Sequence, residues 1–260
     1  MWLRNKSIVI VGGTTGLGLS AAKAFIAQGA NVLAIGRNPQ SAEAASSLLR
    51  TGVVETGDAS QQGTAERAIT SCIDHFGSFD GLYHVAGGSG RRFGDGPLHE
   101  LSLEGWEQTL NLNLTSLMLS NRAAIRYFLE RQTSGSILNM SSVLGYSPSP
   151  NYFVTHAYAA AKSAVFGFSK ATAAYYAKQN IRINVLAPAL VETPMAQRAA
   201  NDEAILSFIK TKQPLDEGRI GVPGDLDGAA IYFMSDYSKF TTGQILSVDG
   251  GWSISEGQYE

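Results

Sequence analysis

Tyr158 and Lys162 are the side chains whose types and spacing most directly suggest acid–base chemistry. They stand four residues apart in the alanine-rich stretch THAYAAAKSAVFGFSK (155–170), which favours a helix with both side chains on one face. A neighbouring ammonium group favours the phenolate, lowering the pKa of a tyrosine from its ordinary value of about 10. Such a tyrosine could exchange a proton near neutral pH, as needed to make or break an alcohol. Because short motifs also arise by chance, the pair gains weight only from the rest of the chain.

A glycine-rich turn follows the first predicted strand. Residues 7–11 form a continuous β-branched apolar run, typical of a strand buried on both faces, and a helix is expected over 17–28. Gly12, Gly16 and Gly18 lie at this junction. A strand, a tight turn and a helix N-terminus present free N–H groups and a positive dipole end to a phosphate. Glycines also serve purely structural turns, but their placement here favours a nucleotide site.

The end of the second predicted strand bears on which dinucleotide binds. An acid at this position binds the ribose hydroxyls of NAD, whereas a base meets the additional phosphate of NADP. Here Gly36 and Arg37 follow the strand, and the glycine turn offers Thr14 and Thr15 rather than a second base. NADP is therefore favoured and NAD stays possible, since Arg37 could simply be solvated. Asp58, after the third strand, could bind the adenine amino group or cap a helix.

Strands and helices alternate along the whole chain, which predicts an α/β fold with a doubly wound parallel sheet and helices on both faces. About seven strands are expected, at 7–11, 31–35, 53–55, 81–85, 136–140, 181–186 and 244–248. The expected helices cover 17–28, 39–49, 62–76, 103–131, 156–178 and 225–234. The stretch 188–222 is less regular, with one or two short helices. No linker or repeat is found, which favours a single domain over 1–260.

Composition narrows the class of protein. The charged fraction is only 16% against 44% hydrophobic residues, which suggests that partner subunits cover part of the surface. A net charge of −2 gives no general attraction to nucleic acid or acidic membranes. The single cysteine, Cys72, excludes an internal disulfide, and no apolar run is long enough for a signal peptide or membrane span, so a cytoplasmic protein is expected. The scattered histidines predict no metal site.

Several motifs, in order and at compatible distances, resemble those of the short-chain dehydrogenase/reductase family, in its single-domain subgroup of about this length. The resemblance spans residues 7–251. It rests on Gly12, Gly16, Gly18, Asp58, Ala86-Gly87, Asn113, Ser142, Tyr158, Lys162, Pro188 and Asp249-Gly250-Gly251. It implies an NAD(P)-dependent oxidoreductase that interconverts a carbonyl compound and an alcohol. A catalytically silent nucleotide-binding scaffold or sensor of the same fold is the alternative.

The resemblance implies a catalytic tetrad of Asn113, Ser142, Tyr158 and Lys162. Tyr158 would be the general acid/base, and Lys162 would lower its pKa and hold the nicotinamide ribose. Ser142 would hydrogen-bond the substrate oxygen, and Asn113 would hold a water that links Lys162 to solvent. On spacing alone Ser141 rivals Ser142 and Asn111 rivals Asn113; the resemblance selects the second of each pair.

The resemblance also implies cofactor contacts, a substrate lid over 189–222 and a homotetramer. The expected cofactor-binding residues are Gly12, Thr14, Thr15, Gly16, Leu17, Gly18, Arg37, Asp58, Ala59, Ala86, Gly87, Tyr158, Lys162, Pro188, Val191 and Thr193. Three positions depart from the family pattern: His84-Val85 replaces a usual Asn-Asn, and Ala189 replaces a glycine. Arg91 and Arg92, in the glycine-rich loop 87–97, are either solvated or recognise an anionic substrate.

Overall fold

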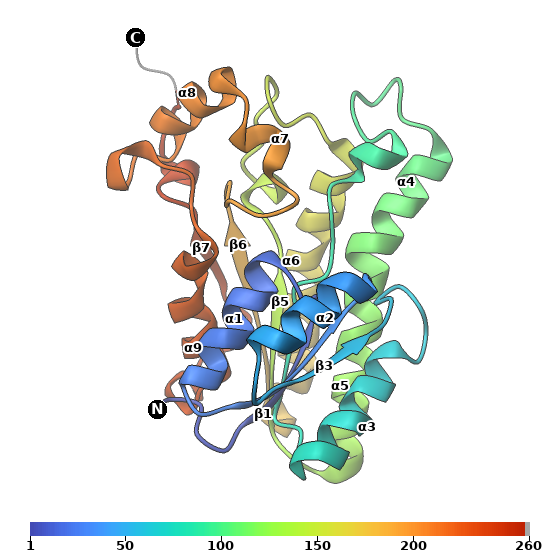
Figure 1. The fold of residues 1–260 in the computed structure, drawn as a ribbon. Helices are drawn as coiled ribbons and strands as arrows, with labels where there is room; N and C mark the ends of the chain where they lie inside the picture. The colour runs from blue at the N-terminus through green and yellow to red at the C-terminus, as the bar shows by residue number, and fades with distance from the viewer. Residues whose placement is uncertain (258–260) are drawn as a thin grey trace.

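The computed structural model describes residues 1–257, and a parallel sheet of seven strands runs through it in the order β3-β2-β1-β4-β5-β6-β7 (Figure 1). The strands are β1 (Ser7–Val11), β2 (Asn31–Gly36), β3 (Val53–Thr56), β4 (Gly81–His84), β5 (Gly135–Met140), β6 (Ile181–Pro188) and β7 (Ile245–Val248). The order reverses between β1 and β4, where a doubly wound sheet opens a crevice for ligands. The predicted fold class and strand pattern are therefore confirmed.

Helices pack on both faces of the sheet. They are α1 (Gly16–Ala27), α2 (Pro39–Leu48), α3 (Thr64–Phe76), α4 (Leu103–Leu110), α5 (Ser116–Arg131), α6 (His156–Tyr176), α7 (Gln197–Ala200), α8 (Glu203–Lys212) and α9 (Asp227–Met234). The apolar sides of α1 and α9 close one core against the sheet, and those of α3, α5 and α6 close the other. Among the described residues no helix is both long and apolar enough to cross a membrane.

The helix predicted over 103–131 is continuous in the structure, but it is not α-helical throughout. A π-helical turn, Asn111–Thr115, joins α4 to α5. A π turn accommodates an extra residue in an α-helix and often occurs at functional sites. Asn113 lies in this turn with its side chain fully buried, whereas Asn111 is exposed. Periodicity alone could not reveal the turn, since its five residues continue the helical stretch and no residue type marks a π turn.

The glycine turn after β1 is held tightly against the loop after β4. Gly12 has a φ of +88°, and a Cβ there would lie 2.6 Å from the backbone nitrogen of Ala86. Gly18, in the first turn of α1, packs so closely on Gly12 that a Cβ would overlap the Gly12 carbonyl. Only glycine permits both the positive φ and this close approach. The two loops at the crevice are thereby brought together.

An aromatic cluster fixes the segment 189–222, which was expected to be a substrate lid. Phe208 of α8 packs on Tyr152 with tilted rings, at 4.9 Å between centroids, and meets Trp252 edge-on at 5.8 Å. Phe153 meets the same tryptophan at 5.7 Å. Trp252 is almost fully buried in this cluster. The segment thus packs on the loop that precedes α6 and on the C-terminal region, and α7 and α8 lie at the top of Figure 1, beyond the carboxyl ends of the central strands.

Candidate active site

A pocket of about 530 Å³ opens at the carboxyl ends of β1, β4, β5 and β6. It joins the glycine turn to α6 and to the first part of the segment 189–222. Most of the predicted site residues line it. These are Gly12, Thr15, Gly16, Leu17, Ala86, Gly87, Ser142, Tyr158, Lys162, Pro188, Val191 and Thr193. The fold therefore brings together motifs spread over most of the chain.

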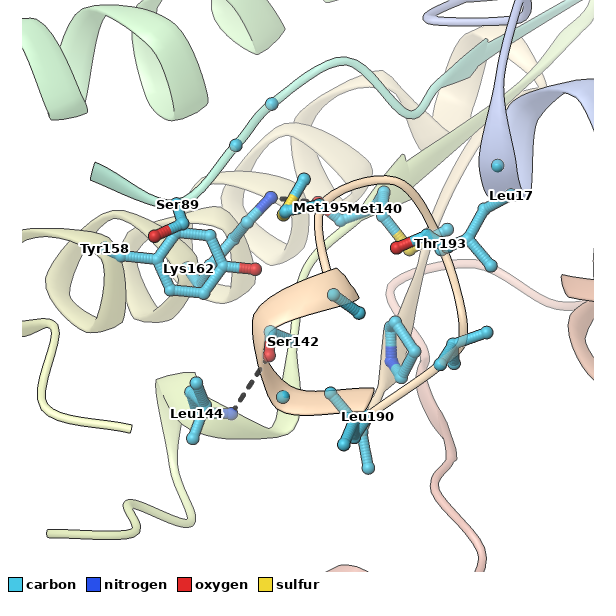
Figure 2. Close-up of a pocket in the computed structure, with 18 of the residues that line it drawn as sticks. Leu17, Ser89, Met140, Ser142, Leu144, Tyr158, Lys162, Leu190, Thr193 and Met195 are labelled. Atoms are coloured by element: carbon cyan, nitrogen blue, oxygen red, sulfur yellow. Dashed lines mark hydrogen bonds between the residues drawn. The ribbon is translucent and has the colours of Figure 1, made fainter. Parts of the chain in front are cut away.

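Tyr158, Lys162 and Ser142 all line this pocket, and the Lys162 nitrogen points toward Met140 (Figure 2). As expected, α6 places the first two on one face, with Lys162 Nζ 5.5 Å from the centroid of the Tyr158 ring. Lys162 Nζ donates a hydrogen bond to the Met140 carbonyl at 3.1 Å. The Ser142 hydroxyl accepts one from the Leu144 N–H at 3.2 Å. An acid, a cation and a hydroxyl thus converge on one cavity.

The pKa of Tyr158 does not follow the expectation that Lys162 lowers it. Burial raises the pKa of this phenol to about 12, and hydrogen bonding to Ser142 acts in the opposite direction. Burial disfavours the charged form of either residue, so it also lowers the pKa of Lys162 to about 8. The Lys162 ammonium is turned toward Met140 rather than toward the phenol oxygen. Tyr158 is therefore fully protonated at neutral pH.

Ser141, the alternative to Ser142 on spacing alone, uses its hydroxyl to bind the backbone of α6. Its buried hydroxyl donates a hydrogen bond to the backbone carbonyl of Lys162 at 2.7 Å. This bond ties the end of β5 to the helix that carries Tyr158. The geometry thus favours Ser142 as the hydroxyl available to a substrate, in agreement with the resemblance.

Asn113 holds the loop that follows β4. Its side-chain amide donates to the carbonyls of Gly88 and Thr109, both at 2.9 Å, and its oxygen accepts the Gly88 N–H at 3.0 Å. A Cβ at Gly87 would lie 2.8 Å from this oxygen and 3.4 Å from Lys162 Nζ. Gly87 therefore separates Asn113 from Lys162 with no room for a side chain. Because an amide oxygen can accept two hydrogen bonds, one acceptor position remains for a water.

Known proteins are similar in sequence to almost the whole of this chain. A family model described as Enoyl-(Acyl carrier protein) reductase matches residues 11–253. The 3-oxoacyl-(acyl-carrier-protein) reductase FabG of Chlamydia trachomatis serovar D is 35% identical over 257 residues, covering 96% of this chain and 98% of that protein. This chain belongs to the short-chain dehydrogenase/reductase family.

Other members of the family act on different compounds. The 3beta-hydroxysteroid dehydrogenase 1 of Eggerthella lenta is 33% identical over 261 residues, covering 98% of this chain and 96% of that protein. A solved short-chain dehydrogenase/reductase from Mycobacterium ulcerans has a TM-score of 0.89 at 26% identity, with 99% and 93% of the two chains covered. These relatives are oxidoreductases, which supports NAD(P)-dependent oxidoreduction by this chain, but their names do not agree on a substrate.

Asp95 is a residue of the site that the sequence analysis missed. It is buried, and its two carboxylate oxygens accept the N–H groups of Ala157 and Tyr158, each at 2.9 Å. The first turn of α6 has no side-chain cap of its own, since Thr155 makes no capping bond. Asp95 thus caps α6 from a loop more than 60 residues earlier. No local pattern could have indicated this, because capping rules consider only neighbours in the chain.

The residues expected at the adenosine end lie apart from this pocket. Arg37 Nη1 is 3.9 Å from Asp58 Oδ2, and the side chain of Arg37 is exposed. Burial tends to raise the pKa of Asp58, but hydrogen bonds from Ser60 and the charges of Arg37 and Arg92 lower it overall. Ala59 packs at the edge of the core. Thr14 is buried against β2, so its side chain, unlike that of Thr15, does not line the pocket.

The family departure at His84 changes the polar contacts beneath the site. The imidazole is fully buried, with Nδ1 3.0 Å from the Ser120 hydroxyl and Nε2 3.5 Å from that of Ser116. Burial and the charge of Lys162 lower the pKa of His84 to about 3. It is therefore neutral and links β4 to α5. No group of three or more His, Cys, Asp or Glu side chains suited to a metal is found within residues 1–257.

Proposed function

We propose that the protein is an NADPH-dependent reductase of a carbonyl compound and that Tyr158 is its general acid. The observation that carries the proposal is a protonated, half-buried phenol in the same pocket as the glycine turn and Ser142. A pKa of about 12 keeps the proton on Tyr158 at neutral pH, as reduction of a carbonyl requires. The same residues would act in reverse on an alcohol.

Tyr158, Ser142, Lys162 and Asn113 each have a part in the proposed reaction. When bound, the dinucleotide supplies a hydride to the carbonyl carbon. Tyr158 donates its proton to the carbonyl oxygen, and the Ser142 hydroxyl hydrogen-bonds that oxygen and stabilises the developing negative charge. Lys162 would stabilise the resulting phenolate and hold the nicotinamide ribose. Asn113 holds a water that returns a proton through Lys162.

The preference for NADP rests on the charge at the end of β2. Arg37 is exposed there, and Arg92 is close enough to Asp58 for both positive charges to lower the pKa of that carboxyl. Two guanidinium groups favour the additional phosphate of NADP. Replacement of Arg37 by Asp should lower the ratio of NADPH to NADH affinity by about tenfold or more, because it replaces attraction by repulsion. An unchanged ratio in titrations with both cofactors contradicts this role.

The remaining cofactor contacts follow the family and the pocket. Gly12 to Gly18 would bind the pyrophosphate through backbone N–H groups, Asp58 and Ala59 the adenine, and Ala86 and Gly87 the adjoining ribose. Pro188, Val191 and Thr193 would meet the nicotinamide. All of these lie at the carboxyl edge of the sheet. We treat residues 1–260 as a single NAD(P)-binding domain with its substrate lid at 189–222.

A panel of aldehydes, ketones and alcohols, followed by NADPH absorbance, tests the reaction. Replacement of Tyr158 by Phe should reduce turnover by about 10²–10⁴-fold, since the general acid is lost. NADPH affinity in a binding titration should stay within about twofold, because the ring remains. Undiminished turnover would reject Tyr158 as the acid. NADPH binding without turnover of any compound would instead favour a silent nucleotide-binding protein.

We further propose a cytoplasmic homotetramer. Large apolar side chains are exposed on α6 and near the C-terminal strand, including Tyr175, Phe240 and Ile254. Exposed apolar groups of this size are typical of surfaces that bind a partner. A second copy of the chain would cover them, with α4, α5 and α6 packing against their counterparts. Light scattering that shows a stable monomer at micromolar concentration contradicts this assembly.

A further inference from the structure

Two arginines from different parts of the chain meet at the mouth of the pocket. Arg91 lies in the 3-10 turn Gly90–Phe93 after β4, and Arg198 lies in α7. Each donates a hydrogen bond to the same acceptor, the backbone carbonyl of Tyr152, at 3.4 and 3.2 Å. Both line the pocket that contains Tyr158 and Ser142. A neutral carbonyl oxygen is thus the only hydrogen-bond acceptor described for either guanidinium within residues 1–257.

Within residues 1–257 no acidic side chain forms an ion pair with either of these arginines, although other arginines do form ion pairs. Asp95 is near Arg91, but both of its oxygens bind the N-terminus of α6. Burial and the positive charge of Arg198 lower the pKa of Arg91, and the charge of Asp95, which acts in the opposite direction, does not offset them. Like charges held together without an ion-pair partner are stabilised by a bound anion.

The position of the pair relative to the cofactor region points to a substrate. Arg37 lies at Asp58 and outside this pocket, and Arg92 lines the pocket but acts on Asp58. Arg91 and Arg198 instead meet at Tyr152, beside the lid. Phe153 and Met195 add apolar surface to the same pocket. A ligand could therefore place an uncharged carbonyl at Tyr158 and a charged end between Arg91 and Arg198.

We propose that the substrate carries an anionic group, a carboxylate or a phosphate, that binds between Arg91 and Arg198 while its carbonyl lies at Tyr158. The inference rests on the proposed function and adds the substrate class to it. Paired guanidinium groups form bidentate, charge-assisted hydrogen bonds with such oxygens. Because the two arginines come from the β4 loop and the lid, the anion also links these elements across the pocket mouth.

Binding can be tested without turnover. Isothermal titration calorimetry of the NADPH complex would compare hexanoate, hexyl phosphate, hexanol and inorganic phosphate. We expect at least one alkyl anion to bind about tenfold or more tightly than hexanol, and this advantage to fall about tenfold in Arg91→Gln and in Arg198→Gln. Lys210→Gln, on the exposed side of α8, makes the same charge change outside the pocket and should preserve it.

Several results would overturn the inference. Equal affinity for hexanol and both alkyl anions would remove the anion site, and so would an equal loss in Lys210→Gln. Inorganic phosphate binding as tightly as hexyl phosphate would indicate a free-anion site rather than a substrate subsite. A tenfold loss of NADPH affinity in Arg91→Gln would assign that arginine to the cofactor.

Turnover separates this inference from the proposed function. A series of ω-oxo carboxylates of increasing length is compared with the corresponding methyl esters, using NADPH absorbance. We expect the acids to have the higher kcat/KM, and the double variant Arg91→Gln/Arg198→Gln to abolish that advantage. Arginine-dependent binding of hexanoate with no turnover of any compound would count against the reductase and leave the anion site supported. Turnover of acids and esters alike, insensitive to the arginines, would refute the substrate class and leave the reductase supported.

Discussion

Replacement of Asp95 by Ala should both destabilise the protein and slow catalysis, because this carboxylate caps the helix that carries Tyr158. It accepts two buried backbone N–H groups at 2.9 Å, and hydrogen bonds to a charged acceptor contribute about 1.5–3 kcal/mol each. Since the two share one carboxylate they do not add fully, and we expect a loss of about 3 kcal/mol in the free energy of unfolding. For a domain of this size the corresponding fall in Tm is about 6–12 °C.

Asp202 provides the matched control. Its carboxylate also accepts two backbone N–H groups, those of Ala204 and Ile205, but it is half-buried and caps α8 instead of α6. Asp202→Ala should lower the free energy of unfolding by about 1 kcal/mol, as expected for an ordinary helix cap. Thermal unfolding by circular dichroism, at one protein concentration, measures both variants.

The value of kcat should also distinguish the Asp95 variant from the Asp202 variant. In Asp95→Ala the first turn of α6 loosens and the Tyr158 hydroxyl loses its fixed position, so kcat should fall about tenfold or more. Asp95→Asn retains one acceptor oxygen and should recover part of both losses. If Asp95→Ala unfolds no more easily than Asp202→Ala and retains full kcat, the capping argument is wrong.

Three further predictions concern the pocket. Because burial lowers the pKa of Lys162 to about 8, kcat/KM for reduction should decline as pH rises through about 8 and the ammonium loses its charge. The Lys162→Arg variant has a side chain that is always protonated, so its pH profile should lack this decline. An identical pH profile in both proteins contradicts the assignment. Gly87→Ala should lower kcat about tenfold, because its Cβ would lie 2.8 Å from Asn113 Oδ1. In Gly88→Ala the Cβ meets only the flexible Leu112 side chain, at 3.2 Å, so kcat should fall less. Equal losses of kcat in steady-state assays of the two variants would refute this. Gly12→Ala should lower the free energy of unfolding in urea by at least about 2 kcal/mol and abolish NADPH binding, because φ is +88° and Ala86 N is only 2.6 Å from the new Cβ. A stable variant that still binds NADPH would disprove this expectation.

The fold was predictable from the chain because its signals are local. A buried parallel strand such as Ser7–Val11 is a run of β-branched residues, and glycines mark the turns between strands and helices. Short-range spacing likewise places Tyr158 and Lys162 on one face of α6. These features depend on residues within one or two helical turns of each other. The fold class and the family could therefore be predicted from these motifs without any coordinates.

What the sequence by itself determined is thus the element pattern, the glycine turn after the first strand, and the placement of Tyr158 and Lys162 on one face of a helix. Tertiary structure alone decided that Asp95 caps α6, that Ser141 binds the Lys162 carbonyl, and that Arg91 and Arg198 meet. It also reversed the expected direction of the Tyr158 pKa, because burial outweighs a nearby ammonium that is turned toward another carbonyl. Burial and contacts between distant segments depend on how the whole chain packs, and the spacing of residues along it carries no such information.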